Sequence, residues 1–157
     1  MIDTYLFDWG DTLMVDFPNQ EGKMSEWPKV EAVIGAQQVL ALLSRQAKIY
    51  IATGAQDSSV MDIKKAFSRV GLSAYISGYF CENNIGLAKG SPEFLSAILT
   101  ALDKPATSVA LVGDSFKKDI EPAVAVGIHP IWLTKSNIGV VPDTVQIITN
   151  LIQLCKP

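Results

Sequence analysis

Three short and almost entirely apolar runs dominate the pattern of this sequence. The runs are Tyr5–Phe7, Ile49–Ala52 and Val109–Val112. A strand that is buried on both faces of a parallel sheet needs no alternation of polar and apolar residues, so these runs predict the interior strands of an α/β fold. Two weaker candidates, residues 75–80 and 128–133, bring the predicted sheet to about five strands. Pro130 places the last of these at an edge, because proline cannot donate a hydrogen bond to a neighbouring strand.

Helical patterns fill the stretches between the runs. The predicted helices cover residues 31–46, 57–70, 92–102, 119–126 and 144–154. Gly71 and Gly127 follow two of them as C-terminal stops, and Ser91 with Pro92 is a typical helix start. Alternating strands and helices predict a three-layer αβα sandwich around a mostly parallel, Rossmann-like sheet. With 157 residues, we expect residues 1–157 to form a single domain.

Charge and cysteine content exclude several classes of protein. Thirteen Lys+Arg against sixteen Asp+Glu give a net charge of −3, whereas a protein that binds duplex nucleic acid is normally basic. Cys81 and Cys155 have the spacing of neither a zinc site nor a disulfide framework. No apolar stretch is long enough to span a bilayer, and the N-terminus does not resemble an export signal, so we expect a cytoplasmic protein.

Each of the three apolar runs ends in a polar residue. Asp8 follows the first run, Thr53 the second and Asp114, after Gly113, the third. Any one of them could simply begin a turn, but the carboxyl ends of parallel strands meet at one rim, where ligands bind in such sheets. Lys89 shortly precedes the helix start at Ser91. A cation beside the N-terminus of a helix is favourable only if an anion lies between the two, so Lys89 points to an anion-binding site. Alternatively, Lys89 is an ordinary surface lysine.

The charge balance of this rim predicts a metal ion. Asp8, Asp11, Asp114 and Asp119 contribute four negative charges, against one positive charge from Lys89. Crowded carboxylates raise one another's pKa or bind a cation, and oxygen ligands suit a hard ion such as Mg²⁺. Asp119 could instead cap the following helix.

Four motifs resemble the signatures of the haloacid dehalogenase-like (HAD) hydrolase superfamily and occur in the same order along the chain. They span residues 7 to 119, which is most of the chain. The motifs are Phe7-Asp8-Trp9-Gly10-Asp11-Thr12-Leu13, Thr53 after the second run, Lys89-Gly90-Ser91-Pro92-Glu93, and Gly113-Asp114-Ser115-Phe116-Lys117-Lys118-Asp119.

The resemblance implies a Mg²⁺-dependent phosphohydrolase in which Asp8 attacks phosphorus and forms an aspartyl-phosphate. Asp8, the Gly10 carbonyl, Asp114 and Asp119 would hold the metal. Thr53 and the Gly54 amide would bind the phosphate oxygens. Lys89 would balance the charge of Asp8 and the phosphate.

The chain departs from the family at Gly10. Phosphatases of this superfamily usually carry there a second Asp, which protonates the leaving group and then activates water. Here the acid appears one place later, as Asp11, which would reach the leaving group only if the loop rotates. General acid–base catalysis contributes about 10²–10⁴-fold. The alternative is therefore a catalytically weak module that binds a phosphate or a partner.

The spacing of the motifs leaves no room for a cap domain. Residues 13–30 are too few for one, so we expect an open site that accepts a phosphorylated small molecule or an exposed phosphate on a macromolecule, in a chain that could form homo-oligomers. The aromatic residues of this loop, Phe17 and Trp27, could fold over the rim or simply pin the loop to the surface. Lys64, Lys65 and Arg69 are expected to form a solvated helix face.

Overall fold

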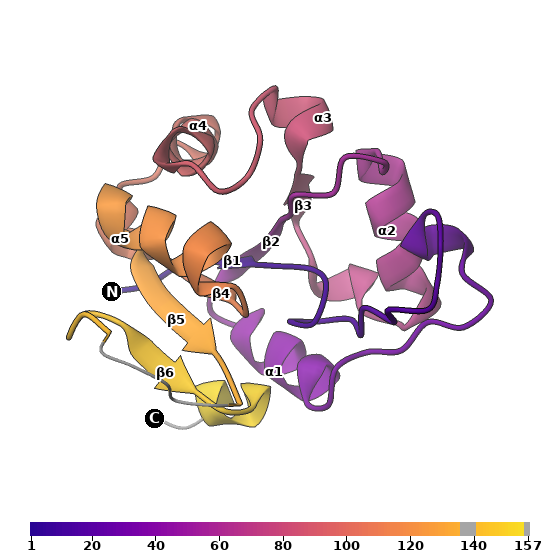
Figure 1. Ribbon diagram of the computed structural model, residues 1–157. Coiled ribbons are helices and arrows are strands. Elements are labelled where there is room, and N and C mark those ends of the chain that lie inside the picture. The colour runs from indigo at the N-terminus through magenta and orange to yellow at the C-terminus, as the bar shows by residue number, and fades with distance from the viewer. Residues whose placement is uncertain (136–140, 156–157) are drawn as a thin grey trace.

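The computed structural model describes residues 1–135 and 141–155, which form one six-stranded sheet with helices on both faces (Figure 1). The strands are β1 (Thr4–Phe7), β2 (Lys48–Ala52), β3 (Gly78–Phe80), β4 (Val109–Gly113), β5 (His129–Leu133) and β6 (Gln146–Ile148). All are parallel, in the order β3-β2-β1-β4-β5-β6. The predicted Rossmann-like α/β sandwich is confirmed, with one strand more than expected.

The helices pack in two layers. They are α1 (Ala36–Leu43), α2 (Val60–Arg69), α3 (Glu82–Ile85), α4 (Pro92–Leu102) and α5 (Glu121–Val126). Figure 1 shows α4 and α5 together on one side of the sheet and α1 and α2 on the other. Two hydrophobic clusters fill the space beneath them. Phe94 and Ile98 lie in the α4/α5 cluster, and Leu40 and Phe67 lie in the α1/α2 cluster.

The register of the central strands sets the position of the site. Phe7 of β1 lies beside Ile51 of β2 and Val112 of β4, so these three strands end level with one another. From β1 the chain adds β2 and β3 on one side and then crosses back to place β4 on the other side of β1, so the strand order reverses between β1 and β4. In parallel sheets such a point opens a crevice for ligands.

The prediction for the C-terminal residues is wrong in two respects. The expected helix over residues 144–154 is a strand, β6, followed by a 3-10 helix over Leu151–Cys155. As a result β5 is an interior strand, not the edge that Pro130 suggested. Pairing between β5 and β6 begins at Ile131, one residue after the proline, so the ladder requires no N–H from Pro130. The open edge of β5 offers backbone hydrogen bonds that outweigh the local helical pattern.

Several helix boundaries also differ from the prediction. Helix α1 begins at Ala36, five residues late, because Ala32 pairs with Met14 in an antiparallel bridge and Gly35 adopts a left-handed conformation with φ of 87°. Helix α2 begins after Ser59, whose side chain forms a capping box with Asp62. The predicted helix start at Asp119 lies inside a π-helical turn, Phe116–Ile120, and the short helix α3 was not foreseen.

Arg69 is exposed, as predicted for a solvated helix face, but its side chain also binds another segment of the chain. Its guanidinium donates hydrogen bonds to the carbonyl oxygens of Ser25, at 3.2 Å, and Trp27, at 2.6 Å. Lys23 forms an ion pair of 3.0 Å with Asp62 of the same helix. Helix α2 therefore anchors residues 16–30, which we call the rim segment, against the α1/α2 core.

Among the described residues, none of the helices combines the length and the apolar character that crossing a membrane requires.

Phe67 joins the rim to the core, because its ring lies 6.0 Å from Trp9 and 5.9 Å from Tyr79. It is fully buried. We expect Phe67→Ala to lower the free energy of unfolding by about 3–5 kcal/mol, from lost apolar burial and the cavity left behind. Met61→Ala on the same helix, where the side chain is 74% exposed, should cost less than about 0.5 kcal/mol. Urea denaturation measures both, and equal losses would contradict this account of the core.

Candidate active site

The predicted site residues lie around one cavity at the carboxyl ends of the central strands. The cavity measures about 460 Å³, enough for a small ligand. Residues predicted from the sequence that line it are Asp8, Gly10, Asp11, Thr53, Gly54, Lys89, Asp114 and Asp119. Residues from four separate segments are thus brought together.

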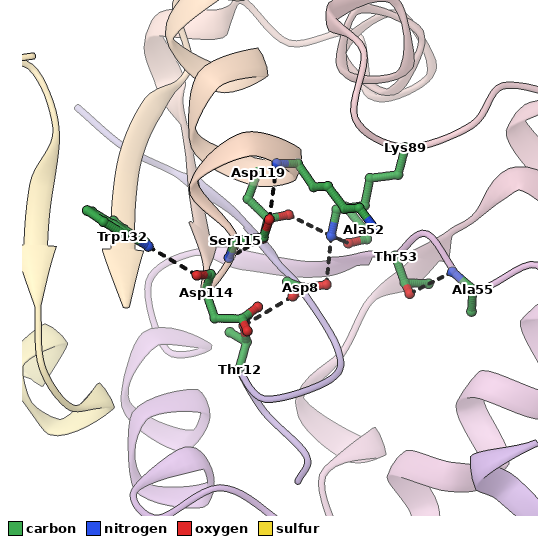
Figure 2. Close-up of polar contacts among 11 residues, drawn as sticks. Asp8, Thr12, Ala52, Thr53, Ala55, Lys89, Asp114, Ser115, Asp119 and Trp132 are labelled. Atoms are coloured by element: carbon green, nitrogen blue, oxygen red, sulfur yellow. Dashed lines mark hydrogen bonds and ion pairs between the residues drawn. The ribbon is translucent and has the colours of Figure 1, made fainter. Parts of the chain in front are cut away.

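Lys89 forms the centre of the site (Figure 2). Its ammonium lies 2.6 Å from Asp8 Oδ1 and 2.6 Å from Asp119 Oδ1. It also donates a hydrogen bond of 3.1 Å to the carbonyl oxygen of Ala52, at the end of β2. The side chain is only 6% exposed, so this lysine is no surface residue. A buried ammonium with two carboxylates and a carbonyl as partners is fully satisfied.

Asp8 is held as an ionised carboxylate. Burial opposes its charge, but the Lys89 ammonium and hydrogen bonds outweigh burial and hold the pKa of Asp8 below its ordinary value. Its backbone N–H donates to Val112 of β4 at 2.9 Å, which fixes the start of the loop. Thr12 donates its hydroxyl toward Asp8 Oδ2 at 3.3 Å and Asp114 Oδ1 at 3.4 Å, so these two oxygens face each other.

Asp114 and Asp119 complete a group of three carboxylates whose nearest oxygens all lie within 4.8 Å of one another. The Trp132 indole donates to the Asp114 carbonyl at 3.0 Å (Figure 2), and the Ser115 N–H donates to Asp119 Oδ2 at 3.2 Å. Asp119 does not cap α5. Its carboxylate packs against Gly113, where any Cβ would overlap it, so glycine is required at the end of β4.

The pKa values of Asp114 and Asp119 both lie above the ordinary value for an aspartate. Burial, a hydrogen bond with Asp8 and the charges of Asp8 and Asp119 raise the pKa of Asp114 to about 7. Burial also raises the pKa of Asp119 to about 6, although Lys89 partly opposes the rise. One ammonium does not balance three carboxylates, and a divalent cation would relieve the remaining repulsion. The donor set of carboxylate oxygens therefore fits Mg²⁺.

Thr53 and Gly54 lie opposite the carboxylates. The Thr53 hydroxyl accepts the Ala55 N–H at 3.2 Å, which leaves its own O–H free to donate into the cavity. Gly54 packs closely on Lys89, since a Cβ there would lie 3.3 Å from the lysine Cβ. Together they form a donor surface that matches phosphate oxygens.

Asp11 is exposed and lines the cavity, but it is not one of the three clustered carboxylates. It has a φ of 60°, and its Oδ1 accepts the Asp16 N–H at 3.0 Å. Asp16 was missed by the sequence analysis, although it also lines the cavity. Partial burial and the charges of Asp11 and Asp8 raise the pKa of Asp16 above its ordinary value. No motif or spacing distinguishes it in the sequence.

The rim segment forms one wall of the cavity. Gly22, Met24 and Trp27 line it, and the Trp27 indole donates to the Gly22 carbonyl at 3.0 Å. Trp27 is only 6% exposed, so it both pins the segment and borders the site. Lys118 also lines the cavity, where its positive charge can attract an anionic ligand.

Comparison with known proteins agrees with this arrangement. A family model described as haloacid dehalogenase-like hydrolase matches residues 15–127. The chain belongs to this family. Between β1 and α1 the described residues of this HAD-like hydrolase contain only a 3-10 helix, Met24–Glu26, so no cap domain is inserted there. In sequence, no curated protein matches the chain.

Solved structures share the fold of this HAD-like hydrolase. An uncharacterized protein from Listeria monocytogenes serotype 4b is 23% identical, with a TM-score of 0.82 over 97% of this chain and 94% of that one. A 2-haloacid dehalogenase from Pseudomonas syringae pv. tomato is 18% identical, with a TM-score of 0.77 over 99% and 97%. The HAD-hydrolase YfnB from Bacillus subtilis, solved bound to magnesium, is 16% identical, with a TM-score of 0.76 over 98% and 96%.

The raised pKa values predict how stability depends on pH without a metal. Between about pH 4 and pH 7 the folded state retains protons on Asp114 and Asp119 that an unfolded chain, with carboxyl pKa values near 3.8, has released. This contribution is complete below about pH 4 and is lost as pH rises through 6 and 7. In EDTA, the free energy of unfolding should therefore fall from about pH 5 to about pH 8.

Urea titrations across this range measure the effect. Asp114→Asn removes the group with the larger shift, so its decline should be smaller than that of the wild type. A wild-type stability that rises over this range, or a decline that Asp114→Asn leaves unchanged, would contradict the assignment.

Proposed function

We propose that this HAD-like hydrolase is a Mg²⁺-dependent phosphatase that cleaves phosphate monoesters through an aspartyl-phosphate on Asp8. The observation that carries the proposal is the Asp8 carboxylate itself, which is ionised, 13% exposed and held by Lys89 on the floor of the cavity. An ionised carboxylate needs no neighbouring base to act as a nucleophile.

In the proposed reaction Asp8 is the nucleophile, and other residues bind the phosphate or balance its charge. Asp8 attacks phosphorus in line and displaces the leaving oxygen on the far side, toward the mouth of the cavity. Thr53 and the Gly54 amide donate hydrogen bonds to the phosphate oxygens and orient them. Lys89 remains beside Asp8 and reduces the repulsion between this carboxylate and the phosphate. Water then hydrolyses the aspartyl-phosphate, which restores Asp8.

The fit of Mg²⁺ rests on the three carboxylates. Asp8, Asp114 and Asp119 would hold the ion, with the Gly10 carbonyl as a further ligand. When bound, Mg²⁺ neutralises charge on the phosphoryl group and screens it from the nucleophile.

The open site suits either a phosphorylated small molecule or a phosphate exposed on a macromolecule. Among the described residues no cap domain is inserted between β1 and α1, and the rim segment borders the cavity instead. We place the reaction in the cytoplasm.

A second candidate is a module that binds a phosphate or a partner with negligible turnover. Gly10 favours it, because the position of the usual acid carries no side chain. Steady-state release of phosphate separates the two candidates, whereas binding of a phosphate analogue does not.

Replacing the nucleophile gives the first test. We expect Asp8→Asn to abolish steady-state phosphate release from a panel of phosphate esters, because an amide oxygen cannot form the acyl-phosphate. Asp103→Asn is the matched control. It makes the same change at an exposed position where φ is 53°, a conformation that asparagine tolerates, and it should retain full activity. Activity that survives in Asp8→Asn would refute the mechanism.

Removing the metal gives the second test. EDTA should eliminate phosphate release and excess Mg²⁺ should restore it, because three carboxylates without a cation repel a phosphate ester. The assay is repeated with wild-type protein dialysed against EDTA and titrated with MgCl₂. Full activity in the dialysed protein would rule out the proposed role of these carboxylates.

A further inference from the structure

Gly10 leaves a gap two residues after the nucleophile, and the carboxyl group of Asp16 lies beside this gap. A Cβ built on Gly10 would lie 3.4 Å from Asp16 Cβ, 3.4 Å from its Oδ2 and 3.6 Å from its Cγ. An acidic side chain at residue 10 would therefore lie beside the carboxylate of Asp16, six residues further along the chain. Both Asp16 and Asp8 line the same cavity.

A tight turn brings Asp16 to this place. The N–H groups of Leu13 and Met14 both donate to the Trp9 carbonyl at 3.1 Å, and Gly10 pairs with Met14 in a parallel bridge. Asp11 closes the turn with its φ of 60° and accepts the Asp16 N–H at 3.0 Å. Asp11 is thereby engaged in holding the chain at Asp16.

Asp8 and Asp16 line the same cavity at different depths. Asp8 lies on the floor of the cavity, whereas Asp16 is exposed at its mouth. The leaving oxygen departs on the side of phosphorus opposite to the nucleophile, which is the side of the mouth. A carboxyl group there can reach the leaving oxygen, and later a water molecule that attacks from the same side.

We propose that Asp16 is the general acid and base of this hydrolase, in place of the missing side chain at residue 10, with Asp11 as its positioning residue. The proposal rests on the phosphatase function proposed above. As the bond between Asp8 Oδ and phosphorus forms and the ester P–O bond breaks, the Asp16 carboxyl gives its proton to the leaving oxygen, which departs as an alcohol. The Asp16 carboxylate then accepts a proton from water as the water oxygen bonds to phosphorus, and Asp8 and inorganic phosphate are released.

Dependence on the leaving group tests this assignment. Alkoxides need a proton to depart, whereas 4-nitrophenolate does not. We expect Asp16→Asn to lower kcat/KM for propyl phosphate by about 10²–10⁴-fold and for 4-nitrophenyl phosphate by less than about tenfold. A purely structural role would lower both by the same factor. Glu21→Gln is the matched control: it removes one charge from an exposed acid of the rim segment and should change neither rate.

A relocation variant tests the same assignment from the opposite direction. A Cβ on Gly10 would make only ordinary contacts, so Gly10→Asp combined with Asp16→Asn can place a carboxyl at the usual family position. This double variant should recover activity toward propyl phosphate relative to Asp16→Asn alone. A double variant no better than Asp16→Asn counts against the proposal.

The outcomes separate this proposal from the phosphatase function. Equal losses for the two esters in Asp16→Asn, or no loss for either, would overturn the role of Asp16 while the function stands, provided that Asp8→Asn is inactive. A wild type that hydrolyses only 4-nitrophenyl phosphate would also overturn it. No hydrolysis of either ester by the wild type with Mg²⁺ would refute the phosphatase function, and the role of Asp16 with it.

Discussion

The buried ammonium of Lys89 is the interaction on which the site depends. It lies 2.6 Å from both Asp8 and Asp119 and also bonds to the end of β2, so it ties together three segments that approach the rim from different directions. Without this cation three carboxylates would face one another in a partly dehydrated crevice, and their repulsion would oppose folding of the rim. The chain nonetheless remains short of positive charge there, which is why we propose that a divalent ion binds at this site.

The parallel sheet brings these groups together at the carboxyl ends of its central strands. Level strand ends bring Asp8, Thr53 and Asp114 to one edge, and Gly113 allows the Asp119 carboxylate to lie directly against β4. The surrounding core holds these strands rigidly, through fully buried residues such as Phe7 and Val112. Catalytic groups on rigid strand ends keep their geometry more closely than groups on free loops.

The rim segment gives this small hydrolase a wall in place of a cap. Arg69 and Lys23 fasten it to α2, and Trp27 is buried between the segment and the core. The segment also delivers Asp16 to the gap beside Gly10. A short, well-anchored loop thus borders the cavity where larger relatives could use an inserted domain, and the cavity stays open to solvent.

The sequence alone determined the α/β class, the interior strands β1, β2 and β4, and the candidate residues from Asp8 to Asp119. These follow from local properties: continuous apolar runs, polar residues directly after them, and motifs whose order is written along the chain. Only the tertiary structure decided that residues 146–148 pair as a strand, that Arg69 binds the rim segment and that Asp16 lies beside Gly10. Each of these depends on which backbone or side-chain partners the folded chain offers to a segment. The hydrophobic periodicity of a segment does not identify these partners, because strand edges, carbonyl acceptors and gaps form only when distant parts of the chain pack together.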